Sequence, residues 1–324
     1  MKKTTILAIL GLLVFNLSFG QDREKYSELI KEAWNLYQTK GYKQSAEKYS
    51  QAFSVLGDKS NTSDRYNAAC SWALAKEIDS SFAQLIQIAK KGNYSNYRHI
   101  TTDSDLDNLH LDKRWSEVLK LVKSNKVKKE ANFDKPLVAI LDTVLQQDQG
   151  LRKQINEVEK KYGRDSKEMR DHWKKIAQKD SINLIKIQKI LDERGWLGPD
   201  IIGNQGNSTL FLVIQHSDLS IQEKYLPMMR DAVSKGNARA NSLALLEDRV
   251  ALSQGNSQIY GSQIYSDKDG KRYVAPLIDP ENVDKRRAEV GLGTLQDYVS
   301  RWNIVWDVEK YKKELPELIA NLKK

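Results

Sequence analysis

The sequence predicts a mainly α-helical protein of two domains with one small β-hairpin. Apolar residues recur at three- and four-residue steps over most of the chain, which is the period of an amphipathic helix. Only six prolines occur in 324 residues, and 29% of the residues are charged, as in a helix-rich surface. Alternation of polar and apolar residues is confined to residues 258–275. The length exceeds that of one ordinary core, so we expect two domains.

The first twenty residues have the pattern of a cleaved signal peptide. Lys2 and Lys3 precede an apolar run from Ile6 to Phe15, and Ser18 and Gly20 are small residues at the expected cleavage site. A membrane anchor is the alternative, but the run is shorter than the ~20 apolar residues that span a bilayer. We therefore expect an exported protein, periplasmic or secreted, with no membrane span in the mature chain. No cysteine lies near the site to carry a lipid.

The charge of the chain argues against a nucleic-acid partner. The formal net charge is +9, and removal of Lys2 and Lys3 leaves 50 basic and 43 acidic residues, or +7. The densest basic stretch runs from Lys120 to Lys135 and contains one aromatic residue, Phe133. A nucleic-acid-binding segment pairs such charge with aromatic or base-reading groups. We interpret residues 124–135 as a solvated basic linker, with weak attraction to an anionic surface as the alternative.

Residues 22–123 form two predicted helical hairpins. In residues 22–56, two apolar stripes are separated by Gly41, which favours a turn. A second pair covers residues 66–75 and 79–89 and ends at Gly92. Large aromatic residues followed by small ones at helical spacing are typical of helices that interlock in repeats.

Four stretches of this first domain carry a family resemblance. They are Tyr66-Asn67-Ala68-Ala69-Cys70, Gly92, the aspartate-rich turn at residues 103–109, and Asp112-Lys113-Arg114-Trp115. Together they resemble the truncated tetratricopeptide modules of exported bacterial proteins. The resemblance implies an array that docks an unknown protein partner, and it does not identify that partner.

Neither Cys70 nor the aspartates at residues 103–107 predict a metal site. Cys70 is the only cysteine and lies among small residues, as a buried, unreactive thiol does. A calcium loop counted from Asp103 requires glycine at its sixth position and glutamate at its twelfth, where Asn108 and Arg114 stand. We expect these aspartates to cap turns and helices, and we expect no metal and no cofactor.

Residues 136–324 are predicted to form a second helical domain. A long helix from Pro136 to Gly163 is followed by a second helix over residues 165–193. His172 lies among charged neighbours and is interpreted as a solvated surface residue. Residues 203–208 are predicted to form a flexible polar loop before an apolar helix at residues 209–214.

The remaining elements follow in order. Helices are predicted after Leu219 and at residues 243–250, and the β-hairpin at residues 258–275 has its turn at Asp267–Gly270. Three final helices cover residues 280–289, 295–306 and 308–322.

Four separated motifs in this second domain carry another resemblance. They are Gln215-His216-Ser217-Asp218, Tyr225-Leu226-Pro227, Leu246-Glu247-Asp248-Arg249-Val250 and Gln258-Ile259-Tyr260-Gly261-Ser262-Gln263. In this order they resemble domain-of-unknown-function family 6624 over residues 137–300. Ser262 stands where the resemblance leads us to expect threonine, so a hydroxyl is retained. The family has no established activity, and the resemblance implies the domain alone.

The same motifs supply the candidate site. His216 could act as a general base if Asp248 held its other ring nitrogen, and Arg249 offers a planar donor fork for a carboxylate or phosphate. Five further residues bring polar groups that could bind a small polar or anionic ligand: Gln215, Asp218, Gln258, Tyr260 and Gln263. One histidine with scattered aspartates is a poor set of transition-metal ligands.

Three interpretations of these residues remain open. They could form a buried structural network in which each polar group satisfies another. They could line the ligand pocket of a binding protein of the bacterial envelope, with the pocket around His216. They could also serve an exported hydrolase, with His216 and Asp248 as its acid–base pair and Arg249 orienting an anionic substrate.

Overall fold

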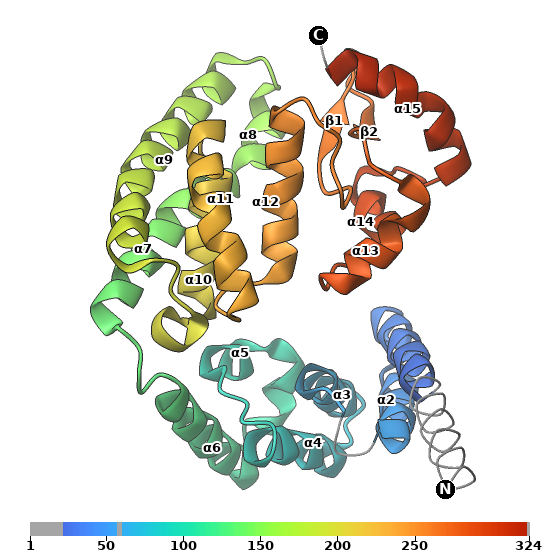
Figure 1. Ribbon diagram of the computed structural model, residues 1–324. Helices are drawn as coiled ribbons and strands as arrows, with labels where there is room; N and C mark the ends of the chain where they lie inside the picture. Colours follow the sequence, from blue (N-terminus) through green and yellow to red (C-terminus); the bar gives the residue numbers. More distant parts are fainter. Residues whose placement is uncertain (1–21, 57–59, 323–324) are drawn as a thin grey trace, which may run out of the picture. The chain divides into compact units, whose positions relative to one another are not determined.

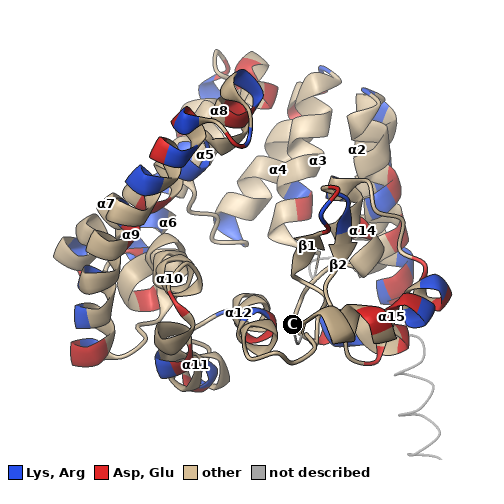
Figure 2. Ribbon diagram, turned by 90° about the horizontal axis from the view of Figure 1, so that it is seen from above, with Lys and Arg blue, Asp and Glu red and all other residues tan. Residues whose placement is uncertain are grey.

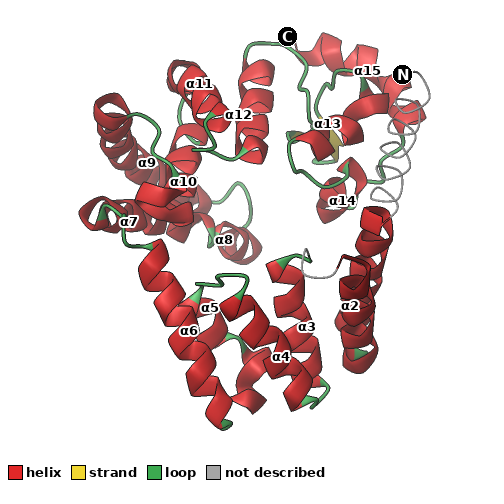
Figure 3. Cartoon of the chain, turned by 60° about the horizontal axis from the view of Figure 1, so that its bottom comes forward, coloured by secondary structure: helices red, strands yellow, loops and turns green. Residues whose placement is uncertain are grey.

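The computed structural model describes residues 22–56 and 60–322. Within this part of the chain the protein is mainly α-helical, and its one sheet has two strands (Figures 1 and 3). The predicted fold class is thereby confirmed. Contacts divide the chain into one unit up to Ala131 and another from Asn132, and each is described by itself. The expected signal peptide, residues 1–20, lies outside the described residues.

The first unit consists of antiparallel helices in succession along the chain. Residues 22–38 are helical and are followed by α2 (Tyr42–Leu56), α3 (Thr62–Leu74), α4 (Ile78–Lys90), α5 (Tyr97–Thr102), the 3₁₀ helix η2 (Ser104–Leu109) and α6 (Lys113–Lys129). Small residues permit close packing of these helices, and two of them, Ala33 and Ala46, are fully buried. The Ser45 hydroxyl donates to the Ala33 carbonyl at 2.8 Å, and Ser81 donates in the same way to Ala69.

The predicted basic linker, residues 124–135, is helical over its first six residues. They form the last part of α6, whose Val118 and Val122 are fully buried and hold the helix to its unit. Lys126 also pairs with Glu130, four residues on, which supports the helix to its end. The non-helical connection is therefore shorter than the basic segment.

The second unit begins with six helices, five of which share one apolar core. They are α7 (Lys135–Arg152), α8 (Ile155–Tyr162), α9 (Lys167–Arg194), α10 (Pro199–Gln215), α11 (Leu219–Ser234) and α12 (Ala240–Ser253). Buried residues of α7 and α9 to α12 form the core, among them Leu141, Ile187, Leu210, Met229 and Leu246. Acidic and basic residues are interspersed along the outer faces of α8 and α9 (Figure 2).

The expected long helix from Pro136 to Gly163 is two helices, because the chain turns after Arg152. His172 contacts this end: its Nε2 lies 2.8 Å from the carbonyl oxygen of Leu151, which also accepts the backbone N–H of Gln154. His172 is 7% exposed, so the interpretation of this residue as a solvated histidine was wrong.

The polar segment 203–208, expected to be a loop, belongs to α10. Only Gly203 departs from helical geometry, with φ 69° and ψ 165°. Gly206 meets α7 closely, since a Cβ there would lie 3.0 Å from a methyl of Leu141. The Asn207 amide donates to the carbonyls of Leu197 and Asn237. Tertiary packing therefore fixes this polar stretch as helix.

The rest of the second unit carries the hairpin. Strands β1 (Ile264–Ser266) and β2 (Arg272–Val274) pair antiparallel with Tyr265 opposite Tyr273. The predicted hairpin at residues 258–275 is thus shorter, and residues 258–263 form an irregular segment. The elements η3 (Pro280–Asn282), α13 (Val283–Glu289), α14 (Leu295–Val299), η4 (Ser300–Trp302) and α15 (Val308–Leu322) follow and share a second core with the hairpin. Among the described residues, no helix combines the length and the apolar character that crossing a bilayer requires.

Candidate functional site

Asp248 organises the irregular segment at residues 258–263. It lies on α12 and is fully buried. Its Oδ1 accepts the backbone N–H groups of Ile259 at 2.7 Å and Tyr260 at 2.9 Å, and its Oδ2 accepts that of Ser262 at 2.9 Å. Burial raises the pKa of Asp248, and the three N–H groups lower it without cancelling that effect. This carboxylate is an internal anchor for the backbone of the segment.

Donors from later in the chain fix the carbonyl groups of the same segment. Arg286 donates to the carbonyl of Ile259 at 3.0 Å, and Arg287 donates to that of Tyr260 at 2.7 Å. The Tyr298 hydroxyl donates to the carbonyl of Ser262 at 2.8 Å. With both its N–H and C=O groups paired, the segment has a fixed shape before any ligand arrives.

Gln258 completes this internal framework. Its side chain is fully buried, and its amide donates to the carbonyls of Ala275 and Gln263. Its Oε1 accepts the N–H of Gln263 at 2.8 Å. The structure therefore places Gln258 inside the protein, where it joins the segment to the end of β2, and not on a ligand-accessible surface.

Arg249 lines a cavity. The adjacent Asp248 is buried elsewhere, because neighbouring residues of a helix point to different faces. The cavity has a volume of about 400 Å³, and its walls come from α10, α12, the hairpin and η4. The lining residues used below are Gln215, Arg249, Gln263, Arg272, Tyr298 and Trp302. Two of them are arginines, and no aspartate or glutamate lines this cavity.

The guanidinium of Arg249 has no protein partner among residues 22–56 and 60–322. Its Nε is buried without a hydrogen bond, and no ion pair or hydrogen bond joins its other nitrogens to a described residue. The Oε1 of Gln215, on the same cavity, is likewise buried and unpaired. Burial lowers the pKa of Arg249, and the nearby Tyr265 and Tyr298 oppose that shift only in part. Arginine nevertheless stays protonated, so the cavity holds a partly buried cation that lacks a counter-ion.

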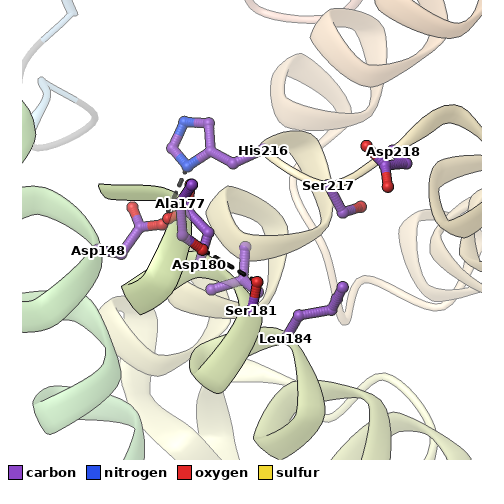
Figure 4. Close-up of a pocket in the computed structure, with 9 residues that line it drawn as sticks. Asp148, Ala177, Asp180, Ser181, Leu184, His216, Ser217 and Asp218 are labelled. Atoms are coloured by element: carbon purple, nitrogen blue, oxygen red, sulfur yellow. Dashed lines mark hydrogen bonds and ion pairs between the residues drawn. The ribbon is translucent and has the colours of Figure 1, made fainter. Parts of the chain in front are cut away.

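His216 lies in a different cavity and has a different partner from the one expected. Its Nδ1 is 3.0 Å from Oδ1 of Asp148 on α7 (Figure 4). Both oxygens of Asp248 are taken by backbone N–H groups. The predicted acid–base pair of His216 and Asp248 is therefore wrong. The cavity beside the imidazole measures about 200 Å³, and Asp180 and Asp218 also line it.

Asp148 is the centre of an ion-pair network between helices. It is 1% exposed and also receives hydrogen bonds from Gln149 and Arg152, and Arg152 forms a bidentate pair with Asp180 at 2.8 and 2.7 Å. Burial raises the pKa of Asp148, but the hydrogen bond and charge of His216, with smaller contributions from its other partners, outweigh that effect and hold the pKa below its usual value. The network joins α7, α9 and α10.

The predicted site residues are thus distributed over three places. Gln215, Arg249 and Gln263 line one cavity, and His216 and Asp218 line another. Asp248 and Gln258 are buried parts of the framework, and Tyr260 lines neither of the two cavities.

Several residues of these cavities were missed by the sequence interpretation. Asp148 had a detectable signal, since it follows Leu141 and Val144 on the buried stripe of α7, where a charge requires a partner. Arg272, Tyr298 and Trp302 had none, because their shared cavity is created by packing between distant segments.

One group of described residues has the spacing of a metal site: Cys70, Asp103 and Asp105. Its carboxylates already accept hydrogen bonds, from Tyr66 to Asp103 at 2.9 Å and from Tyr37 to Asp105 at 2.5 Å. Burial and the neighbouring aspartates raise the pKa of the Cys70 thiol, which disfavours the thiolate that binds metals. These residues serve as internal links of the first unit.

Comparison with known proteins identifies the second unit. A search of curated proteins and a search of solved structures each gave no significant match. A family model described as "Family of unknown function (DUF6624)" matches residues 135–309, which is more than half of the 324 residues. The match covers α7 to the hairpin and the helices after it, and so contains both cavities. The chain belongs to this family.

Proposed function

We propose that the second unit binds a small ligand through a carboxylate or phosphate group in the Arg249 cavity. The observation that supports this function is the unpaired guanidinium of Arg249 in a cavity without acidic residues. A buried charge is costly unless a counter-ion or hydrogen bonds compensate it. An entering anion supplies that compensation, because the guanidinium fork matches the two oxygens of a carboxylate or phosphate.

The surrounding groups suit the neutral part of such a ligand. Gln215 offers an unpaired carbonyl oxygen, and Gln263 lines the cavity from the preorganised segment. Because Asp248 and Arg287 already hold that segment, binding requires little ordering of the backbone.

A binding function is supported better than hydrolysis. The hydrolase hypothesis required Asp248 to orient His216 and Arg249 to hold the substrate beside that imidazole. Asp248 instead accepts three backbone N–H groups, and His216 and Arg249 line different cavities.

We further propose that this binding occurs outside the cytoplasm and that the first unit docks a protein partner. The basic and apolar pattern of residues 1–20 supports export, and the tetratricopeptide-like motifs support docking. Sequencing of the N-terminus of the mature protein tests export. A chain that begins at Gln21 or Asp22 is expected, and an intact Met1 in the exported fraction would contradict cleavage.

Calorimetric titration tests the anion site. Inorganic phosphate and acetate serve as probes in a low-salt buffer, with the full mature chain as receptor. Arg249→Met is expected to abolish the measured binding, and Arg249→Lys to weaken it about tenfold, because a lysine keeps the charge but loses the fork.

The matched control is Arg230→Met on α11. Arg230 is exposed and pairs with Glu247, outside the cavity, so its removal leaves binding unchanged. Equal affinities in the wild type and Arg249→Met would refute the proposed site.

A further inference from the structure

A second cationic cavity adjoins the Arg249 cavity. It has a volume of about 590 Å³ and lies between the hairpin turn and the segment after α14. Arg272 and Trp302 line both cavities, so the two are joined along these side chains. Of these two cavities, Lys271, Arg301 and Lys310 line only the second. Lys271, Arg272 and Lys310 also border an adjoining hollow, whose lining includes Asp307 and Glu314.

All the charged side chains that line the two cavities are positive. Neither lining contains an aspartate or glutamate. Within residues 22–56 and 60–322, Lys271, Arg272 and Arg301 have no ion pair, and Lys310 reaches only Glu314, at 3.9 Å. An exposed lysine needs no partner, because water solvates it. Elsewhere on this unit, however, basic residues alternate with acidic ones, as along α9 (Figure 2). Two adjoining cavities whose linings contain cationic side chains and no carboxylate attract anions.

An aromatic side chain lies where the cavities meet. Trp302 is half-buried, and its ring packs edge-to-face on Tyr298 with centroids 5.2 Å apart. The Arg301 guanidinium lies over the other ring of this pair, 5.2 Å from the Tyr298 centroid. Neutral hydrogen-bonding groups are present on both sides, from Gln263 in the first cavity and Asn303 in the second. Cationic side chains therefore lie on both sides of Trp302, and each cavity also contains at least one amide side chain.

We infer that the ligand is an acidic oligosaccharide whose carboxylates occupy both cavities. This inference rests on the proposed anion site at Arg249. One carboxylate pairs with Arg249 and a second with Arg301 and Lys271, while a sugar ring between them lies against Trp302. Amide side chains then receive the sugar hydroxyls. A chain of linked phosphates carries the charge without any ring for the tryptophan, and it is the competing class.

Calorimetry with four probes tests the inference: galacturonate, trigalacturonate, neutral maltotriose and tripolyphosphate. Wild-type protein is expected to bind the acidic trimer at least about tenfold more tightly than the monomer, since the second subsite adds to the first. Maltotriose is expected to bind more weakly than the acidic trimer by a similar factor. Tripolyphosphate is expected to bind less tightly than trigalacturonate.

The variant Lys271→Gln/Arg301→Gln removes the second subsite only. The monomer is expected to keep its affinity, because neither residue lines the Arg249 cavity, while the advantage of the trimer falls to about twofold or less. Lys174→Gln/Lys235→Gln is the control, because both lysines are exposed and lie outside the two cavities.

The outcomes separate the two proposals. A trimer that binds no better than the monomer, or whose advantage survives Lys271→Gln/Arg301→Gln, overturns the second subsite and leaves the Arg249 site in place. Tighter binding of tripolyphosphate than of trigalacturonate overturns the sugar class. A wild-type protein that binds none of the anionic probes, and binds neither inorganic phosphate nor acetate in the earlier titration, overturns the proposed function itself.

Discussion

Replacement of Asp248 by asparagine removes one of the two oxygens that hold the segment 258–263. Asparagine keeps Oδ1, which accepts the N–H groups of Ile259 and Tyr260, but it places an NH₂ group where Oδ2 accepts the N–H of Ser262. One buried N–H then lacks an acceptor, which costs about 1–3 kcal/mol. The two remaining bonds also lose the strength that a charged acceptor gives.

The substitution has an offsetting gain, because a neutral amide is easier to bury than a carboxylate whose pKa is already raised by burial. We expect a net loss of about 2 kcal/mol in the free energy of unfolding. For a unit of this size, that loss lowers the melting temperature by roughly 4–8 °C. Because the segment carries Gln263 into the Arg249 cavity, the affinity for phosphate falls as well.

Hydrogen exchange at the segment 258–263 is the assay. Faster exchange is expected there in Asp248→Asn, with little change in the core amides of α9. Asp231→Asn on α11 is the control, since Asp231 is exposed and pairs only with Lys235, and its change stays within about 0.5 kcal/mol. Unchanged exchange together with an unchanged melting temperature would refute the role assigned to Asp248.

Two further substitutions test other parts of the second unit. Asp148→Asn is expected to cost about 2–3 kcal/mol at pH 7, because it breaks a buried pair. The pKa of Asp148 is lowered in the folded state, so its contribution is present above the unfolded value of about 3.9 and is lost as the pH falls through the lower folded value. Urea unfolding from pH 7 to pH 2.5 should therefore bring wild type and variant together, and a constant difference would contradict the pairing. Gly261→Ala should cost about 2–4 kcal/mol by thermal unfolding, because φ is +68° and the new Cβ would lie 3.0 Å from a Leu295 methyl. Gly236→Ala, at φ +75° with open space, should lose only about 1 kcal/mol, and equal losses would show that contact with Leu295 is irrelevant.

Local patterns sufficed to predict most of the helices and the existence of the hairpin. Apolar periodicity over residues 165–193 predicted α9 within two residues at its start. Met169, Ile176, Ile187 and Ile190 of that pattern are buried in the structure, whereas Trp173, Ile182 and Ile185 are exposed. Apolar periodicity reports which face of a helix is buried, and that information is contained in the sequence itself.

Long-range partners could not be obtained in that way. His216 and Asp248 appeared compatible as a pair, yet α7 places Asp148 against the imidazole, 68 residues earlier in the chain. The segment 203–208 has the composition of a loop, but a close contact of Gly206 with Leu141 makes it helical. In both cases the decisive energy comes from tertiary packing, which no local window contains.

The cavity residues divide in the same manner. Arg249 and Gln263 were identified because their motifs suggested donors for an anion, and they do line one cavity. Arg272 and Trp302 lie in segments with no such motif, and only the packing of the hairpin against η4 brings them to Arg249.

The stability of Arg249→Met, measured with and without phosphate, examines the unpaired guanidinium itself. In a buffer of low ionic strength, the methionine variant should be at least as stable as the wild type, with a gain of up to about 1 kcal/mol, because an uncompensated and partly buried charge is removed. Added phosphate should then stabilise the wild type in proportion to RT ln(1 + [L]/Kd) and leave the variant unchanged, so that the order of stabilities reverses. A variant that is clearly less stable in the absence of phosphate, and is stabilised by phosphate as much as the wild type, would contradict both the missing counter-ion and the anion site.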